Sequence, residues 1–222
     1  THMAMSSIRV MATCALLGEA VGKAAAVAAK NDFTPHDVFL HKMEDVQTLL
    51  LNEDCFLPSK TRNISDICKN ASLLGAEDVI RNGQDRPHAI YHTDETNFAC
   101  LVPTNEEVCY NFDKTTVSSV HIVFSSDLNR NTLPFSDSER YHPMRANYRL
   151  DSPQMCMPKT LCKDFKLIGE QDGKKFELLN VSNNRKRSYH LNLNQSFDKL
   201  ILIPISNWGD SNCTPIVSFD FN

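Results

Sequence analysis

Two kinds of hydrophobic patterning divide the chain near Ser59. Before this residue the apolar positions are spaced as in helices, and after it they fall in short runs rich in β-branched and aromatic residues. The segment that follows Ser59 is polar, and helical spacing does not return for long. The pattern predicts a helical segment over 4–57, a linker over 58–64 and a strand-rich domain over 65–222. Residues 1–3 have the sequence that a cleaved expression tag leaves behind.

The first predicted helix covers residues 9–30, which are rich in alanine and contain no proline. Its apolar residues go all the way round, as in a helix that is buried on every side. Gly18 and Gly22 lie four positions apart and share one face, where another backbone could approach closely. Because Glu19 and Lys23 interrupt the apolar run, a buried helix of a soluble protein is favoured over a membrane span.

A second helix is predicted after a break at Asn31. Thr34 is placed to cap it, and Pro35 suits the first helical position. Helical spacing continues through 44–51, until the sequence Cys-Phe-Leu-Pro at 55–58 ends it. The first part of the chain is therefore expected to be entirely helical.

Short strands are predicted in the second part, separated by Asn, Gly, Asp and Pro residues. Apolar alternation is clear over 120–124, and the sequence Gln-Asp-Gly-Lys at 171–174 predicts a hairpin turn. Strands of this kind predict a mainly β fold, an antiparallel β-sandwich of the jelly-roll type. The stretch 128–159 contains four prolines and is too long for an ordinary connection, so it is a candidate functional loop. The predicted strands are 97–102, 107–112, 117–124, 161–169, 174–181, 187–193, 197–205 and 214–221.

The composition is that of a folded globular protein, with 41% hydrophobic and 23% charged residues. The formal net charge of -4 gives no basic field that would attract phosphates or acidic membranes. The strongest basic run, 185–187, is three residues long and lacks the interleaved aromatic residues of a nucleic-acid surface. Neither a nucleic acid nor a membrane is therefore expected as a partner.

Motifs that would identify an enzyme are missing from this sequence. It contains no Gly-x-Gly-x-x-Gly, no Gly-x-Ser-x-Gly and no His-Glu-x-x-His. The eight cysteines include no Cys-x-x-Cys pair, which argues against a zinc ribbon and leaves the redox compartment open. His88 and His92 are four apart, but they fall in an irregular region where this spacing does not define a shared face. Catalysis by this chain alone is not expected.

The helical part carries a family resemblance. Residues 9–26 combine the pattern Arg-x-x-x-Thr-Cys-Ala with Gly-x-x-x-Gly-x-Ala-Ala. A Thr-Pro-x-Asp helix start follows at 34–37, then a Leu-rich helix at 46–51 and a Phe-Leu-Pro exit at 56–58. In this order the segments resemble the last helices of the flavin domain in bacterial FAD-dependent oxidoreductases.

The resemblance implies that the start of the first helix faces the flavin end of FAD, where the helix dipole favours negative charge on the reduced ring. The implied contact residues are Thr13, Cys14, Ala15 and Gly18. The glycine-rich turn that would hold the pyrophosphate is not in this sequence. The resemblance therefore implies that FAD and the missing flavin domain belong to a longer parent protein, and no FAD is expected in this chain alone.

The second part carries a resemblance of its own. An Asn-Gly turn at 82–83 with Arg86, and the segments 120–130, 183–187 and 207–209, together resemble the discoidin-like, galactose-binding-like sandwiches that often end such proteins. Two functions remain open for this domain. It could dock on the catalytic domain or a partner subunit as an accessory module, or it could bind glycans as a carbohydrate-binding module.

The glycan interpretation needs an aromatic face and hydrogen-bond donors that converge from loops. Trp208 would supply the face, with packing in the sandwich core as the alternative. A structural calcium ion, as in many galactose-binding-like folds, needs several oxygen ligands, and solvated surface carboxylates are the alternative interpretation of the acidic candidates. The candidate glycan ligands are Trp208, Asn207, Tyr141, His142, Arg140 and Arg145, and the candidate metal ligands are Glu77, Asp78 and Asp220.

In water the N-terminal helices would expose apolar surface, and the strand-rich domain is not expected to have a matching surface that packs against it. Two routes are open: packing of residues 9–57 against the sandwich, or pairing between two copies of the chain through the face of Gly18 and Gly22. Pairing is favoured, which predicts a homodimer.

Overall fold

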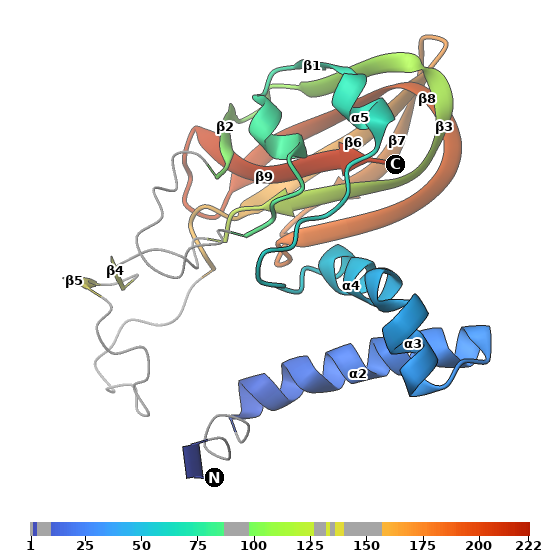
Figure 1. The fold of residues 1–222 in the computed structure, drawn as a ribbon. Helices are drawn as coiled ribbons and strands as arrows, with labels where there is room; N and C mark the ends of the chain where they lie inside the picture. Colours follow the sequence, from blue (N-terminus) through green and yellow to red (C-terminus); the bar gives the residue numbers. More distant parts are fainter. Residues whose placement is uncertain (1, 4–9, 87–97, 127–131, 134–135, 140–156) are drawn as a thin grey trace. The chain divides into compact units, whose positions relative to one another are not determined.

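The computed structural model describes residues 2–3, 10–86, 98–126, 132–133, 136–139 and 157–222 (Figure 1). The chain divides into two compact units, 1–63 and 64–222, each with its own hydrophobic core. The first unit is helical and the second is an antiparallel sheet structure, so the fold is the predicted mainly β fold preceded by a helical segment.

The helical unit contains α2 (Met11–Asn31), α3 (Pro35–His41) and α4 (Met43–Asn52). Asp32 adopts the left-handed conformation that ends α2, and its N–H donates to the carbonyl of Ala28. Thr34 caps α3 as predicted: its hydroxyl accepts from the backbone N–H of Asp37 at 3.2 Å, and the Asp37 carboxylate accepts from the N–H of Thr34 at 3.0 Å. The Thr34 hydroxyl also donates to this carboxylate at 2.6 Å, and this hydrogen bond, followed by that from the Thr34 N–H, lowers the pKa of the Asp37 carboxyl group.

Alanines on α2 let the three helices approach closely. Ala20, Ala24 and Ala28 pack on a small core that also receives Phe33. The buried side chains of this core are Val27, Val38, Val46 and Leu50.

Helix α2 is not buried on every side within this chain, which corrects that prediction. Val27 is its one buried residue, because the described part of the unit covers α2 only along the face that meets α3 and α4. Leu16, Leu17 and Val21 are 55%, 51% and 67% exposed. By length and composition alone, Met11–Asn31 would also suffice to cross a membrane, a test that core helices of soluble proteins and signal sequences pass too.

The sheet unit is built around one antiparallel seven-stranded sheet with the order β2-β9-β3-β8-β6-β7, in which β1 also pairs with β3. A short helix and a 3-10 helix, α5 (Asp66–Asn70) and η1 (Asp78–Arg81), lie at its start. The strands of the sheet are β1 (Ser72–Leu74), β2 (Cys100–Pro103), β3 (Val108–Phe124), β6 (Cys162–Gln171), β7 (Lys174–Val181), β8 (Ser188–Asn207) and β9 (Cys213–Phe221). A separate pair is formed by β4 (Thr132–Leu133) and β5 (Ser136–Glu139).

Two long, bent strands turn this sheet into a sandwich. The first half of β3 and the second half of β8 lie in one layer with β1, β6 and β7, and their other halves lie in a second layer with β9 and β2. Figure 1 shows β3 and β8 curving from one layer into the other. Register shifts between Asn111 and Thr115 and between Val117 and Ser119 mark the bend. The sequence predicted each long strand as two short ones, because polar residues at the bend interrupt the apolar pattern.

Aromatic side chains fill the space between the layers. The Tyr110 ring lies 5.2 Å from that of Phe219 and 5.3 Å from that of Phe221, measured between centroids. Gly169 leaves room for the ring of Phe197, since a Cβ atom at this position would lie 2.4 Å from its Cε1 atom. The predicted hairpin turn joins β6 to β7, with Asp172 and Gly173 both at positive φ.

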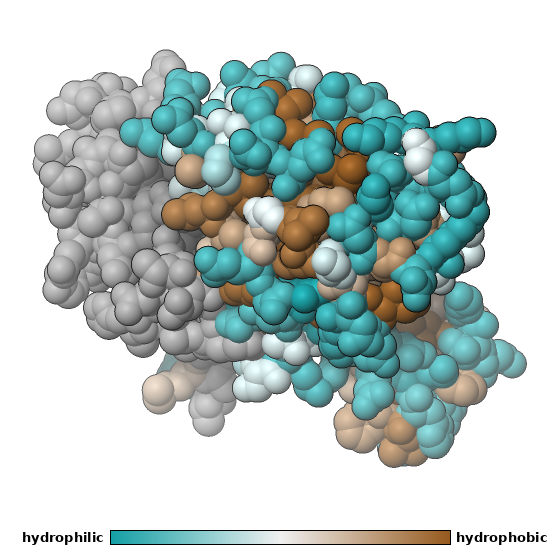
Figure 2. Space-filling view, turned by 90° about the horizontal axis from the view of Figure 1, so that it is seen from above, coloured by the Kyte–Doolittle hydropathy of each residue, from teal (hydrophilic) through white to brown (hydrophobic). Residues whose placement is uncertain are grey.

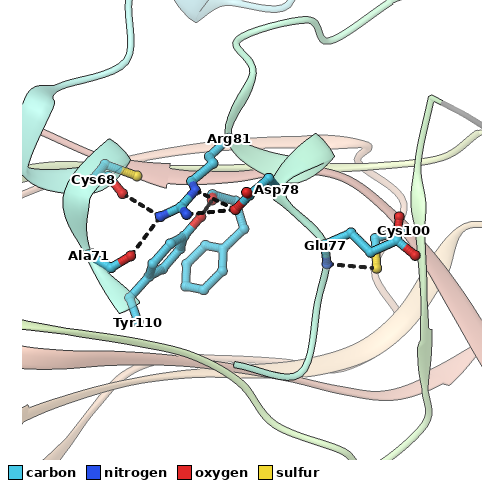
Figure 3. A network of polar contacts seen from close by, with 8 residues as sticks. Cys68, Ala71, Glu77, Asp78, Arg81, Cys100 and Tyr110 are labelled. Carbon is cyan, nitrogen blue, oxygen red and sulfur yellow. Dashed lines mark hydrogen bonds and ion pairs between the residues drawn. The ribbon is translucent and has the colours of Figure 1, made fainter. Parts of the chain in front are cut away.

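Arg81 ties the start of the sheet unit to its core (Figure 3). Its Nη1 atom donates to the carbonyls of Cys68 and Ala71, both at 2.8 Å, and its Nε atom donates to the Asp78 carboxylate at 3.0 Å. The guanidinium carbon lies 5.8 Å from the centroid of the Tyr110 ring. One side chain thus joins α5, η1 and β3.

Replacing Arg81 with methionine is expected to lower the free energy of unfolding by about 2 kcal/mol, because two buried carbonyls lose their donor. Urea unfolding of the full chain would measure this. Asp78→Asn is the matched control: the Asp78 side chain is 81% exposed, so its loss of charge should cost at most about 0.5 kcal/mol. Equal effects of the two changes would contradict this account of Arg81.

Candidate functional site

Three segments of the sheet unit meet around Trp208, the residue that follows β8. Its backbone N–H donates to the carbonyl of Leu161 at 3.1 Å, and its indole Nε1 donates to the carbonyl of Asn184 at 2.7 Å. The side chain is half-buried and packs against the main core. Trp208 therefore joins the start of β6 to the loop between β7 and β8, and part of its ring remains exposed.

Asn207 shapes the loop that carries Trp208. Its side chain is 1% exposed, and its Oδ1 atom accepts from the N–H groups of Gly209 and Ser211 at 3.1 and 2.9 Å. Its Nδ2 atom donates to the carbonyls of Ser211 and Cys213 at 2.8 and 3.1 Å. The sequence predicted Asn207 as a ligand contact, whereas in the structure its amide is engaged within the protein and holds the loop.

Asn184 has a similar role in the facing loop, and the sequence analysis did not single out its side chain. It is 2% exposed, and its Nδ2 atom donates to the carbonyls of Cys162 and Lys186, both at 2.8 Å. Its Oδ1 atom accepts from the N–H of Lys186 at 2.7 Å and from the Tyr189 hydroxyl at 2.8 Å. An asparagine directly before a basic run was the available signal.

Cationic residues lie on the segments that meet at Trp208. The Lys163 ammonium lies 5.2 Å from the centroid of the indole ring, and Lys159 is exposed beside Gly209. Arg185 and Lys186, in the loop that Asn184 holds, are also exposed.

The carboxylate of Asp164 is hydrogen-bonded within the protein. It accepts hydrogen bonds from the Ser206 hydroxyl and, at 2.9 Å, from the backbone N–H of Asn183. These contacts lower the pKa of Asp164, the Ser206 hydrogen bond being the largest cause, and Lys163 also lowers it through its charge. Asp164 is therefore an anion that fastens the loop between β7 and β8.

Four of the predicted glycan contacts lie outside the described residues, as does the pair of histidines that was considered for zinc. Their role therefore stays a prediction. The residues concerned are Arg140, Tyr141, His142, Arg145, His88 and His92.

The three carboxylates that were predicted to bind calcium have separate surroundings. Asp78 forms an ion pair with Arg81 at 2.6 Å, and Asp220 is fully buried in β9. Glu77 lies one residue before η1, and its N–H donates to the sulfur of Cys100 at 3.4 Å. Within the described ranges, no three His, Cys, Asp or Glu side chains are grouped as a metal site would need.

The residues implied to contact FAD lie together at the start of α2. Thr13, Cys14, Ala15 and Gly18 occupy its first two turns, and no acidic residue lies in the first turn. Val10 precedes the helix and provides no side-chain cap. A Cβ atom added at Gly18 would meet no atom within 4 Å. This helix start fits a negatively charged partner at close range.

Comparison with protein families agrees with the helical part of the chain. Residues 1–50 match the family model described as FAD dependent oxidoreductase, which confirms the resemblance of the helical segment. No curated protein sequence matches the chain.

Carbohydrate-binding modules are among the solved structures similar to the chain. The family 32 module from Streptococcus pneumoniae EndoD has 12% sequence identity and a TM-score of 0.42, and the match covers 71% of this chain and 99% of that one. The family 32 module from C. perfringens NanJ, in complex with galactose, has 8% identity and a TM-score of 0.40, with 68% and 91% covered. The structure described as GH31 CBM32-2 bound to GalNAc has 15% identity and a TM-score of 0.44, with 68% and 96% covered.

Proposed function

We propose that this chain is the C-terminal region of an FAD-dependent oxidoreductase and is not catalytic by itself. Its helices α2, α3 and α4 are the closing helices of the flavin domain, and its sandwich is an accessory module that docks on the catalytic part or on a partner subunit. The family match over residues 1–50 is the observation that carries this proposal.

The open face of α2 supports the role of the helical unit. Met11 is 87% and Val21 is 67% exposed, and Cβ atoms added at Gly18 and Gly22 would meet nothing within 4 Å. Leaving apolar surface in water costs roughly 25 cal/mol per Å². This face is therefore suited to packing against the rest of a flavin domain, with Thr13, Cys14 and Ala15 at the flavin ring. When bound, FAD would supply the hydride and electron transfer of the parent enzyme.

The chain by itself is expected to bind no FAD, because it contains no glycine-rich turn whose backbone N–H groups could hold the pyrophosphate. The measurement is the absorbance spectrum of the full chain after purification and again after incubation with excess FAD and gel filtration. The expected result is no flavin band in either sample. A stoichiometric yellow chromophore would overturn the prediction.

An apolar strip on the outer surface of the sandwich supports a docking role. Leu74, Cys109, Ile201 and Ile168 are successive neighbours across β1, β3, β8 and β6, on the side of the sheet opposite the core. Figure 2 shows apolar side chains gathered across the middle of the sheet unit and hydrophilic ones around them. Leu74 is exposed, Cys109 and Ile168 are half-buried and Ile201 is buried, and an apolar strip that is partly open to solvent suits a protein partner.

The exposed part of Trp208 favours glycan binding as a second candidate function. Its indole Nε1 donates to the carbonyl of Asn184 and its backbone N–H donates to that of Leu161, which together give the rigid support that a sugar platform needs. The calcium ion predicted at Glu77, Asp78 and Asp220 is not carried into this proposal, because these carboxylates have separate surroundings.

A glycan array with the full chain would separate docking from glycan binding. If the sandwich binds glycans, Trp208→Ala is expected to reduce the signal at least tenfold while the far-ultraviolet circular dichroism stays unchanged. Phe56→Ala is the matched control, because it removes an exposed aromatic residue from the helical unit instead. An array without any hit would leave docking as the function of the sandwich.

A further inference from the structure

We infer that the surface around Trp208 binds an anionic saccharide, a sugar that carries a carboxylate or a sulfate group, and that Lys163 recognises this charged group. This inference rests on the glycan-binding function proposed above and names its ligand class. The surface consists of Trp208 with four cationic residues, Lys159, Lys163, Arg185 and Lys186.

None of these four cations is neutralised by a carboxylate within the described part of the chain. The ion pairs of other lysines show the contrast: Lys199 contacts Glu170 at 2.8 Å, and Lys166 contacts Glu177 at 3.8 Å. The charge of Lys163 lowers the pKa of Asp164, but the Asp164 carboxylate accepts its hydrogen bonds from Ser206 and Asn183. The positive charge at Trp208 is therefore available to a ligand, although the whole chain carries a formal net charge of -4.

The backbone positions of the cations are fixed by contacts that also fix the indole ring. The side chain of Asn184 forms hydrogen bonds with both the N–H and the carbonyl of Lys186. The backbone carbonyl of Asn184 accepts a hydrogen bond from the indole of Trp208. Lys159 is packed against the loop after β8, since a Cβ atom at Gly209 would lie 2.8 Å from the carbonyl oxygen of Lys159. The two segments that carry these cations are thus attached to the loop that carries the ring.

Lys163 gives this surface its selectivity. Its ammonium lies over the indole ring, a weak contact at a partly exposed site. A carboxylate or sulfate group would draw the ammonium into a charge-assisted hydrogen bond, which is about twice as strong as a neutral one. The freed part of the ring can then receive the apolar face of the sugar. A neutral sugar would have to displace the Lys163 ammonium from the ring without forming such a charge-assisted hydrogen bond.

The test is calorimetric titration of the full chain with galactose, galacturonic acid and galactose 6-sulfate, each at low and at physiological salt. At least one anionic sugar is expected to bind ten times more tightly than galactose, and this preference should shrink as salt rises. The two anionic sugars distinguish a carboxylate from a sulfate ligand.

Lys163→Gln is expected to lower the affinity for the anionic sugar to that for galactose. The matched control is Lys174→Gln, which should leave every affinity unchanged: Lys174 begins β7 opposite Gln171, the last residue of β6, roughly 25 Å along that strand from Lys163. Equal binding of all three sugars, or an anionic preference that survives Lys163→Gln, would overturn this inference and leave glycan binding intact. Failure of all three sugars to bind would overturn both.

Discussion

A protein that lacks the first 59 residues is expected to fold as well as the full chain. Its core is complete, because the buried residues of the sandwich begin at Ile64, and the Ser65 hydroxyl donates to the carbonyl of Phe221 at 2.6 Å within this unit. The helical unit has a separate core and adds no residue to that of the sandwich. Domains of this size with their own core fold alone.

Trp208 provides the measurement, since it is the one tryptophan of the sequence and lies in the sandwich. In urea, its fluorescence should change at the same midpoint in the full chain and in residues 60–222. The matched variant is Val46→Asp in the full chain, which places a charge in the helical core and should remove helical circular dichroism without moving that midpoint. A lower midpoint for residues 60–222 would show that the sandwich needs the helices.

The second large effect is expected at Gly22, which lies on the open face of α2. We propose that two copies of this chain pair through the face of Gly18 and Gly22 when no flavin domain covers it. Gly22→Arg should then convert a dimer into a monomer of 25.1 kDa in sedimentation equilibrium. The substitution adds a bulky charged group to the interface, and within one copy a Cβ atom at this position would meet no atom within 4 Å.

Two controls separate blocking of the interface from other effects of this arginine. Like Gly22→Arg, Gly22→Ala raises the helix propensity of α2, but it adds only a methyl group. It should therefore weaken dimerisation far less. Ala12→Arg adds the same charge at another exposed position of α2. A full chain that is monomeric at all concentrations, or a Gly22→Arg protein that remains dimeric, would contradict pairing through this face.

The local features of the fold could be predicted because local signals determine them. Thr34 and Pro35 predicted the start of α3, and Asp172 with Gly173 predicted the turn between β6 and β7. The continuity of β3 and β8 could not be predicted in this way. Their polar bends are stabilised by neighbouring strands rather than by their own sequence, and Asn194 adopts a positive φ in the middle of β8. The short elements α5, β1 and η1 were missed because they depend on contacts such as those of Arg81.

The candidate site was predicted only in part, for the same physical reason. The sequence indicated Trp208 through its residue type, but not that Asn207 is buried and holds the loop. The role of Asn184 depends on segments 20 or more residues away, such as Cys162 and Trp208, with which it forms hydrogen bonds. The cation over the indole ring was not foreseen either, since nothing in the spacing of Lys163 and Trp208 places them together.

Hydrogen exchange on the full chain tests the central claim most directly, namely that an independent sandwich follows helices made to pack on another protein surface. The account predicts equal protection of β3 and β8 amides in the full chain, in residues 60–222 and in Gly22→Arg. It also predicts that α2 amides are more protected in the full chain than in Gly22→Arg. Loss of protection in β3 and β8 on truncation, together with α2 protection that is unchanged by Gly22→Arg, would contradict it.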